Sequence, residues 1–103
     1  MLRKVHRIQN AGDLKDLKLV EEELSDPKET EVTIEVHSIG LNFADIFALT
    51  GLYSATPKGS FIPGLEYSGI VSKVGNSVSH FSIGDKIMGV TRFGAYSNYL
   101  NIE

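Results

Sequence analysis

The side chains able to bind a metal or attack a substrate are few in this chain of 103 residues. The chain has no cysteine, and its three histidines, His6, His37 and His80, lie far apart in the sequence. Zinc in proteins is held by thiolate, imidazole or carboxylate groups that converge in tetrahedral geometry. Because cysteine is absent and the histidines are spread over predicted strands and turns, the sequence predicts no zinc site. It also excludes a disulfide framework.

Asn42 and Tyr53 are polar side chains at the start of an expected helix and in the loop that follows it. Asn42 precedes apolar residues with the spacing of one helix face, and Asp45 follows it by three positions, which is typical of a capped helix start. An asparagine there contributes about 1 kcal/mol as a helix cap, so capping alone and capping combined with a ligand contact both explain Asn42. Tyr53 lies in a segment rich in glycine and proline, where its ring either packs against the loop or contacts a substrate.

These side chains must be positioned mainly by short strands. Residues 31–37 show the clearest alternation of polar and apolar residues, with Val32, Ile34 and Val36 on one face. A helix is expected over 43–50, followed by an irregular loop that runs to Gly64. Further strands are expected at 2–8, 17–24, 67–74, 86–90 and 95–102. The pattern predicts a mainly β fold, a partly open β-barrel with one short helix.

Composition and charge favour a single soluble domain. Hydrophobic residues make up 42% and charged residues 22% of the chain, as in ordinary globular proteins. The net charge is -3 and lysine and arginine form no long run, so neither nucleic acid nor an anionic membrane is an expected partner. The first residues have no apolar stretch typical of a signal peptide or a membrane span, and we expect a cytoplasmic location.

Four segments resemble the catalytic domain of the medium-chain dehydrogenase/reductase superfamily, whose fold is called GroES-like. They keep the family's order and separations over residues 32–102, and they are Gly40–Asp45, Pro63–Val71, Val74–Ile87 and Gly94–Tyr99. Asn42 and Leu65 stand where the zinc alcohol dehydrogenases of the superfamily have a cysteine and a histidine ligand. The stretch from Asn42 to Asp45, with Arg92 before Gly94, is similar to the quinone oxidoreductase branch, which includes the vesicle amine transport proteins.

The resemblance implies a zinc-independent oxidoreductase that uses NADPH or NADH to transfer hydride to a quinone or an α,β-unsaturated carbonyl. Such a substrate is activated by its own conjugation and needs no Lewis acid. The resemblance also implies that Asn42 and Tyr53 face the active-site cleft as catalytic residues, and that Asn42 binds the cofactor as well. Glu66, with its apolar neighbours, is expected to be a structural acid paired with a cation.

Residues 1–103 contain no Gly-x-Gly-x-x-Gly segment between a strand and a helix, so the dinucleotide-binding fingerprint is missing from them. The resemblance implies that they are the N-terminal part of the GroES-like catalytic domain, and that the Rossmann nucleotide-binding domain lies beyond Glu103. In this family the catalytic domain is completed by a segment that returns after the Rossmann domain. We accordingly expect residues 1–103 alone to be inactive, to bind neither cofactor nor zinc, and to form a homodimer or otherwise self-associate through the uncovered face.

Two other functions fit the same barrel. One is a GroES-like interaction module, because this fold also serves as a ring-forming co-chaperonin subunit, and the segment from Leu52 to Ile62 is the candidate mobile loop. The other is a non-catalytic homologue of the reductases. Reductase activity would favour the enzyme, whereas a seven-fold ring in sedimentation would favour the interaction module.

Overall fold

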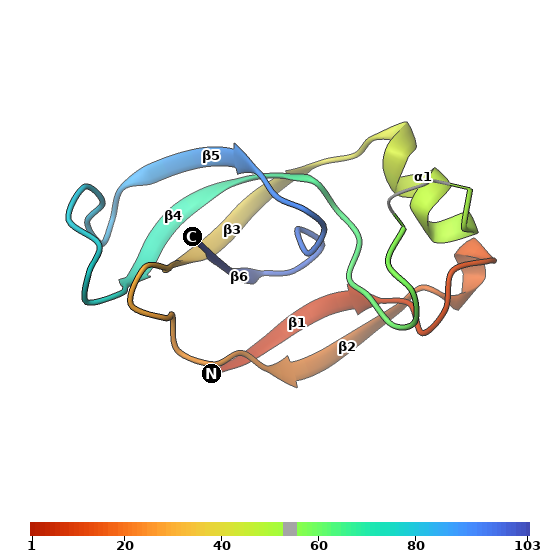
Figure 1. Ribbon diagram of the computed structural model, residues 1–103, viewed down its shortest axis with the longest axis horizontal. Helices are drawn as coiled ribbons and strands as arrows, with labels where there is room; N and C mark the ends of the chain where they lie inside the picture. The colour runs from red at the N-terminus through yellow and green to blue at the C-terminus, as the bar shows by residue number, and fades with distance from the viewer. Residues whose placement is uncertain (53–55) are drawn as a thin grey trace.

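A computed structural model describes residues 1–52 and 56–103 of the chain. Six strands dominate it, with one α-helix and one short 3-10 helix (Figure 1). In chain order the elements are β1 (Leu2–Arg7), η1 (Leu14–Asp16), β2 (Lys18–Glu23), β3 (Val32–Gly40), α1 (Phe43–Thr50), β4 (Glu66–Val74), β5 (Lys86–Val90) and β6 (Tyr99–Ile102). Within the described residues, no helix is both long and apolar enough to cross a membrane.

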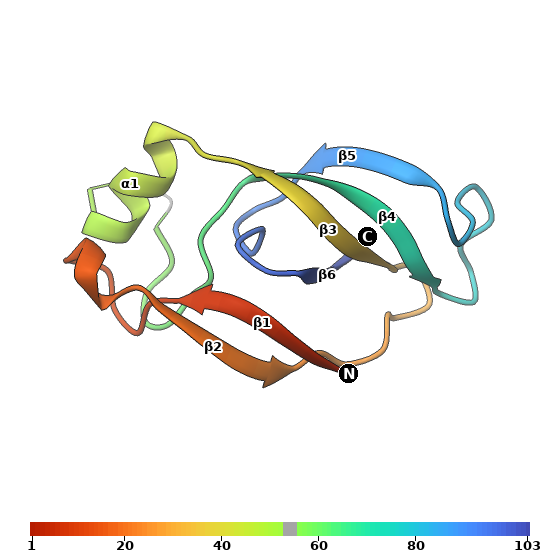
Figure 2. The same cartoon turned by 180° about the vertical axis from the view of Figure 1, so that it is seen from behind.

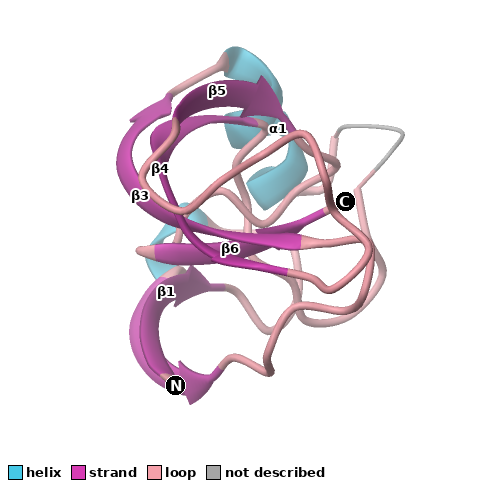
Figure 3. Cartoon of the chain, turned by 90° about the vertical axis from the view of Figure 1, so that its left-hand side faces the viewer, coloured by secondary structure: helices cyan, strands magenta, loops and turns pink. Residues whose placement is uncertain are grey.

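The strands form two antiparallel sheets, which face each other with α1 at one end of the molecule (Figures 1 and 2). One sheet has the order β5-β4-β3-β6 and the other pairs β1 with β2. Isolated bridges, Val5 with Ser97 and Ile8 with Phe61, connect the small sheet to the rest of the chain. Seen end-on, the strands curve around one side and loops complete the other (Figure 3). The predicted mainly β fold, a partly open barrel with one short helix, is confirmed.

Alternating residues of β3 fill the core of the large sheet, as the sequence pattern predicts. Val32 and Ile34 are buried with Tyr67 and Val71 of β4, and Val36 packs against this cluster from a partly buried position. A second apolar cluster fixes α1 to the end of the small sheet, and it consists of Ile8, Ala48, Leu49 and Phe61. The helix is therefore held by its buried face, which leaves its N-terminal end free to line a pocket.

The last strand is shorter than the sequence pattern indicates. The alternation over 95–102 predicts one strand, but the structure begins β6 at Tyr99. The preceding residues form a tight turn instead, because Phe93 and Gly94 have φ angles of 67° and 100° and the N–H of Ser97 donates to the carbonyl of Ala95 at 2.7 Å. This turn points Tyr96 away from the sheet toward α1, where it becomes part of the site described below.

A network of charges holds the small sheet together and ties it to the large one. Glu22 of β2 accepts hydrogen bonds from Arg7 at 2.8 Å and from Arg3 at 2.9 Å, both on β1. Arg3 also donates to the carbonyl of Tyr99 on β6 at 3.1 Å. The hydrogen bond from Arg7, assisted by Arg3 and opposed by partial burial, lowers the pKa of Glu22 below its usual value of 4.5.

We predict that Glu22→Gln removes a pH-dependent part of the stability. A carboxyl whose pKa is lowered by folding stabilises the protein above its unfolded pKa, and that contribution is lost as the pH falls through the folded pKa. Because the network is partly exposed and screened by water, the variant should lose about 0.5 to 1 kcal/mol at neutral pH in urea unfolding. The difference from the parent should shrink as the pH falls below the usual glutamate pKa and vanish only below the lowered pKa of folded Glu22. Glu21→Gln, which alters an exposed neighbour on the same strand, is the control. A loss of stability in Glu22→Gln that is the same at neutral and at acidic pH would contradict the lowered pKa of Glu22.

Candidate active site

A pocket of about 530 Å³ opens where the residue before α1 meets the start of β4 and the end of β5. We name it the Asn42 pocket, and it is lined by Asn42, Phe43, Ala44, Leu65, Glu66, Val90 and Thr91. The N–H of Thr91 donates to the carbonyl of Leu65 at 2.8 Å, which joins the two strand ends. The pocket brings together Asn42 and Leu65, the two positions that correspond to zinc ligands in the resembling alcohol dehydrogenases.

Asn42 lies at the N-cap of α1, with an extended backbone (φ -128°, ψ 154°). Its backbone N–H donates at 3.0 Å to Oδ2 of Asp45, the third residue of the helix. The helix start expected from this spacing is confirmed. The side-chain amide nitrogen of Asn42 is buried and has no hydrogen-bond partner among the described residues. Since a buried donor without a partner costs free energy, Asn42 carries hydrogen-bonding capacity that capping of the helix does not use.

Asp45 is a buried carboxylate that connects the helix start to the turn before β6. It is 2% exposed, and its Oδ2 also accepts a hydrogen bond of 2.9 Å from the hydroxyl of Tyr96. Burial first, and then the hydrogen bond to Asp45 and the negative charge of its carboxylate, raise the pKa of Tyr96 far above the usual tyrosine value. The phenol therefore stays protonated throughout the physiological pH range, and its O–H donates a hydrogen bond to Asp45.

Tyr96 also fixes the other side of the pocket. Its backbone N–H donates to the carbonyl of Pro63 at 2.9 Å, and the N–H of Ala95 donates to the carbonyl of Gly64 at 3.2 Å. Gly64 has a φ of +105°, and a Cβ at this position would lie 2.8 Å from the Tyr96 nitrogen and 2.5 Å from its ring. The close approach of these two segments sets where β4 begins, and so where Leu65 faces the Asn42 pocket.

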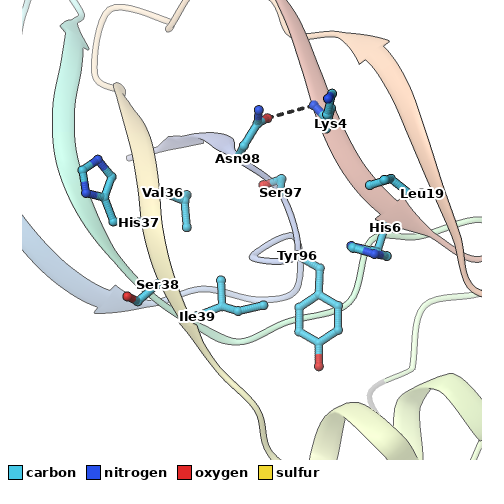
Figure 4. Close-up of a pocket in the computed structure, with 10 residues that line it drawn as sticks. All are labelled: Lys4, His6, Leu19, Val36, His37, Ser38, Ile39, Tyr96, Ser97 and Asn98. Carbon is cyan, nitrogen blue, oxygen red and sulfur yellow. Dashed lines mark hydrogen bonds between the residues drawn. The ribbon is translucent and has the colours of Figure 1, made fainter.

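On its other side, Tyr96 contacts the small sheet. The N–H of His6 donates to its carbonyl at 2.9 Å, and the His6 ring meets the phenol ring edge to face, with centroids 6.4 Å apart. A second, open pocket of about 290 Å³ lies here between β1 and β3 (Figure 4). In this view the ring of Tyr96 projects away from the turn toward α1, with His6 beside it. Tyr96 thus lies between the small sheet and the helix.

The structure changes the interpretation of Glu66 and leaves Tyr53 a prediction. Glu66 is exposed at the edge of the Asn42 pocket, and its carboxylate lies against Gly40 of β3. It has no ion pair with any described residue, so the expectation that it is paired with a cation is wrong for the part of the chain that the structure describes. Tyr53, the second predicted catalytic residue, lies outside the described residues.

The residues of the pocket do not suit zinc. An amide and an alkyl side chain stand at its two ligand positions, and neither is a zinc ligand. Over residues 1–52 and 56–103, no three His, Asp or Glu side chains gather closely enough to hold a metal ion. The unpartnered amide donor of Asn42 suits an organic ligand with a carbonyl or carboxamide acceptor instead.

Asn42 could be identified from the sequence as a candidate site residue, whereas the contact between Asp45 and Tyr96 that holds it could not. Asp45 was predicted only as a helix-capping partner, and Tyr96 only as a residue of the last strand. The two lie 51 positions apart, and no spacing rule for helices or strands connects them. The burial of Asp45, which creates the need for a second donor, follows from tertiary packing, so the sequence carried no signal for this contact.

Comparison with known proteins places these features in a family. The alcohol dehydrogenase GroES-like domain matches residues 28–102. Human synaptic vesicle membrane protein VAT-1 homolog-like is 36% identical over 86 residues, which are 84% of this chain and 20% of that protein. Quinone oxidoreductase 1 of Escherichia coli is 41% identical over 87 residues, which are 84% of this chain and 26% of that protein. The chain thus spans about a fifth to a quarter of the length of these relatives.

Solved structures agree with the sequence comparison. The human VAT-1 homolog-like protein superimposes with a TM-score of 0.93 at 31% identity, over 99% of this chain and 33% of that one. Escherichia coli quinone oxidoreductase in complex with NADPH superimposes with a TM-score of 0.87 at 37% identity, over 99% of this chain and 31% of that one.

We predict that Gly64→Ala destabilises the domain more than Gly59→Ala does. Both glycines have positive φ angles, 105° and 80°, so each substitution costs roughly 1 to 2 kcal/mol of backbone strain. At Gly59 nothing lies within 4 Å of the new Cβ, whereas at Gly64 it would overlap Tyr96. Overpacking of this kind adds about 1 to 3 kcal/mol. Equal midpoints for the two variants in urea unfolding would contradict the close packing of Gly64 on Tyr96.

Proposed function

The chain belongs to the alcohol dehydrogenase GroES-like domain family, and from this membership we propose that it is the N-terminal part of a zinc-independent oxidoreductase that uses NADPH or NADH. The proposed substrate is a quinone or an α,β-unsaturated carbonyl. Relatives named as quinone oxidoreductases support this class, and one of them has been solved with NADPH. The proposed enzyme is longer than these residues, since they contain no dinucleotide-binding fingerprint.

The observation that carries the proposal is the unused amide donor of Asn42 in a pocket whose second ligand position is Leu65. This pair offers one hydrogen bond and one apolar surface instead of a metal. When bound, NAD(P)H supplies a hydride for the electron-poor carbon of the substrate. The amide of Asn42 would hold the nicotinamide carboxamide or a substrate oxygen, and Leu65 would keep water away from that place. Tyr53 is proposed as a second hydrogen-bond donor to the substrate oxygen, on the resemblance alone.

Exposed apolar side chains beside the Asn42 pocket support the proposal that a nucleotide-binding domain packs against it. Two apolar side chains that line it stay exposed in this chain: Phe43 is 80% and Val90 76% accessible. An apolar rim of this kind on a soluble protein usually marks a surface that another part covers. We propose that the nucleotide-binding domain of the full-length oxidoreductase covers it, which would close the site from water.

We predict that Asn42→Ser lowers turnover without lowering stability. Serine is a comparable helix cap but is too short to reach what the amide reaches. In the full-length oxidoreductase, kcat/KM for a quinone or enone should fall about 10-fold to 100-fold, which is roughly 1.4 to 2.7 kcal/mol, while Tm stays unchanged. Asn76→Ser, in the exposed turn after β4, is the matched control.

Unchanged kinetics in Asn42→Ser would restrict Asn42 to capping the helix. Absence of any NAD(P)H-dependent reduction by the unmodified full-length protein would contradict the proposed function. That result would favour a non-catalytic homologue or an interaction module.

A further inference from the structure

We infer that Tyr96 is a positioning residue of the proposed active site, which acts through Asp45 to hold Asn42 in place. The inference rests on the proposed function of Asn42. It concerns a contact between residues 51 positions apart, which joins the turn before β6 to the first turn of α1.

A single carboxylate oxygen of Asp45 links Asn42 to Tyr96. Oδ2 of Asp45 accepts both the backbone N–H of Asn42 at 3.0 Å and the hydroxyl of Tyr96 at 2.9 Å. The other oxygen of Asp45 is buried without a partner among the described residues. A carboxylate that is 2% exposed depends strongly on the few donors it has. Loss of the Tyr96 hydroxyl would leave the Asn42 N–H as the one described donor, and the carboxylate would turn to find another.

Tyr96 is itself held on both sides, so its hydroxyl is a fixed point. Its N–H is bonded to the carbonyl of Pro63, and its carbonyl accepts from the N–H of His6, each at 2.9 Å. The hydrogen bond to Pro63 positions the segment that contains Leu65, just before β4. The hydroxyl positions Asn42 through Asp45. The two facing sides of the Asn42 pocket are thus positioned from one residue that does not line this pocket. A tyrosine that served packing alone would need its ring and not its hydroxyl.

The test removes only the hydroxyl, with Tyr96→Phe in the full-length oxidoreductase. Tyr99→Phe removes a hydroxyl three residues along the chain that has no hydrogen bond among the described residues, and is the matched control. The first readout needs neither cofactor nor activity. Hydrogen exchange of the Asn42 backbone N–H is compared with that of the buried residue Val71, whose N–H donates to the carbonyl of Asp85 at 2.9 Å. We expect Tyr96→Phe to speed exchange at Asn42 at least 10-fold more than at Val71, and Tyr99→Phe to speed neither.

The second readout is a double-mutant cycle with Asn42→Ser. If Tyr96 acts through Asn42, Tyr96→Phe should lower kcat/KM at least 5-fold in the native background and less than 2-fold when residue 42 is already serine. Asp45→Asn, which keeps the shape of the side chain and weakens its hydrogen bonds, should behave in the same non-additive way. It replaces Tyr96→Phe in the cycle if that variant does not fold.

The outcomes separate the two ideas. Equal exchange at Asn42 and Val71, or equal losses of kcat/KM in both backgrounds, would overturn the positioning role and leave the proposed function intact. An Asn42→Ser variant with native kinetics would instead overturn the role of Asn42 and the inference with it. Faster exchange confined to the start of α1, together with the non-additive cycle, would establish Tyr96 as a positioning residue.

Discussion

The hydrogen bond from the hydroxyl of Tyr96 to the buried carboxylate of Asp45 joins the turn before β6 to the first turn of α1, two segments that lie far apart in the sequence. A carboxylate inside a protein is costly unless donors surround it, and Asp45 has two described donors, one from the helix cap and one from a distant turn. The turn before β6, the start of β4 and the start of α1 all meet at Tyr96. The geometry of the Asn42 pocket follows from how these three segments are held.

The sheets supply the rigid frame on which this contact is built. β3 and β4 pair along their whole length, and Val32, Ile34, Tyr67 and Val71 bury the face that they share. The pocket opens at the end of this sheet, where strands give way to loops, and its polar groups come from loop residues held by the strands. An amide and a leucine line this pocket at the two positions that the resemblance assigns to zinc ligands.

Local patterns predicted the elements of this fold well. The alternation in β3, the cap of α1 and the glycine and proline of the following loop each reflect a local preference. The apolar spacing over 43–50 predicted the helix but not its buried face, because Phe43 and Phe47 are exposed while Ala48 and Leu49 are buried. The error at 95–98 arose because a tyrosine-rich segment suits a strand by composition, while Phe93 and Gly94 turn the chain. The partnership of Asp45 with Tyr96 depends on tertiary packing, and no period in the sequence encodes it. Asn42 could be singled out because it changes a family pattern, whereas Glu66 was misread because it lies exposed at the first position of β4, where no described cation reaches it.

The proposed role of Asn42 as a cofactor-binding residue requires its side chain to lie against the nicotinamide in the full-length oxidoreductase. Saturation transfer in a protein labelled with ¹⁵N at asparagine tests it directly: the nicotinamide protons of bound NADPH are irradiated and the side-chain amides are observed. The largest loss of intensity is expected at Asn42, with little at Asn76 and Asn98, which are exposed away from the Asn42 pocket. Full NADPH occupancy without any transfer to the Asn42 amide would contradict it.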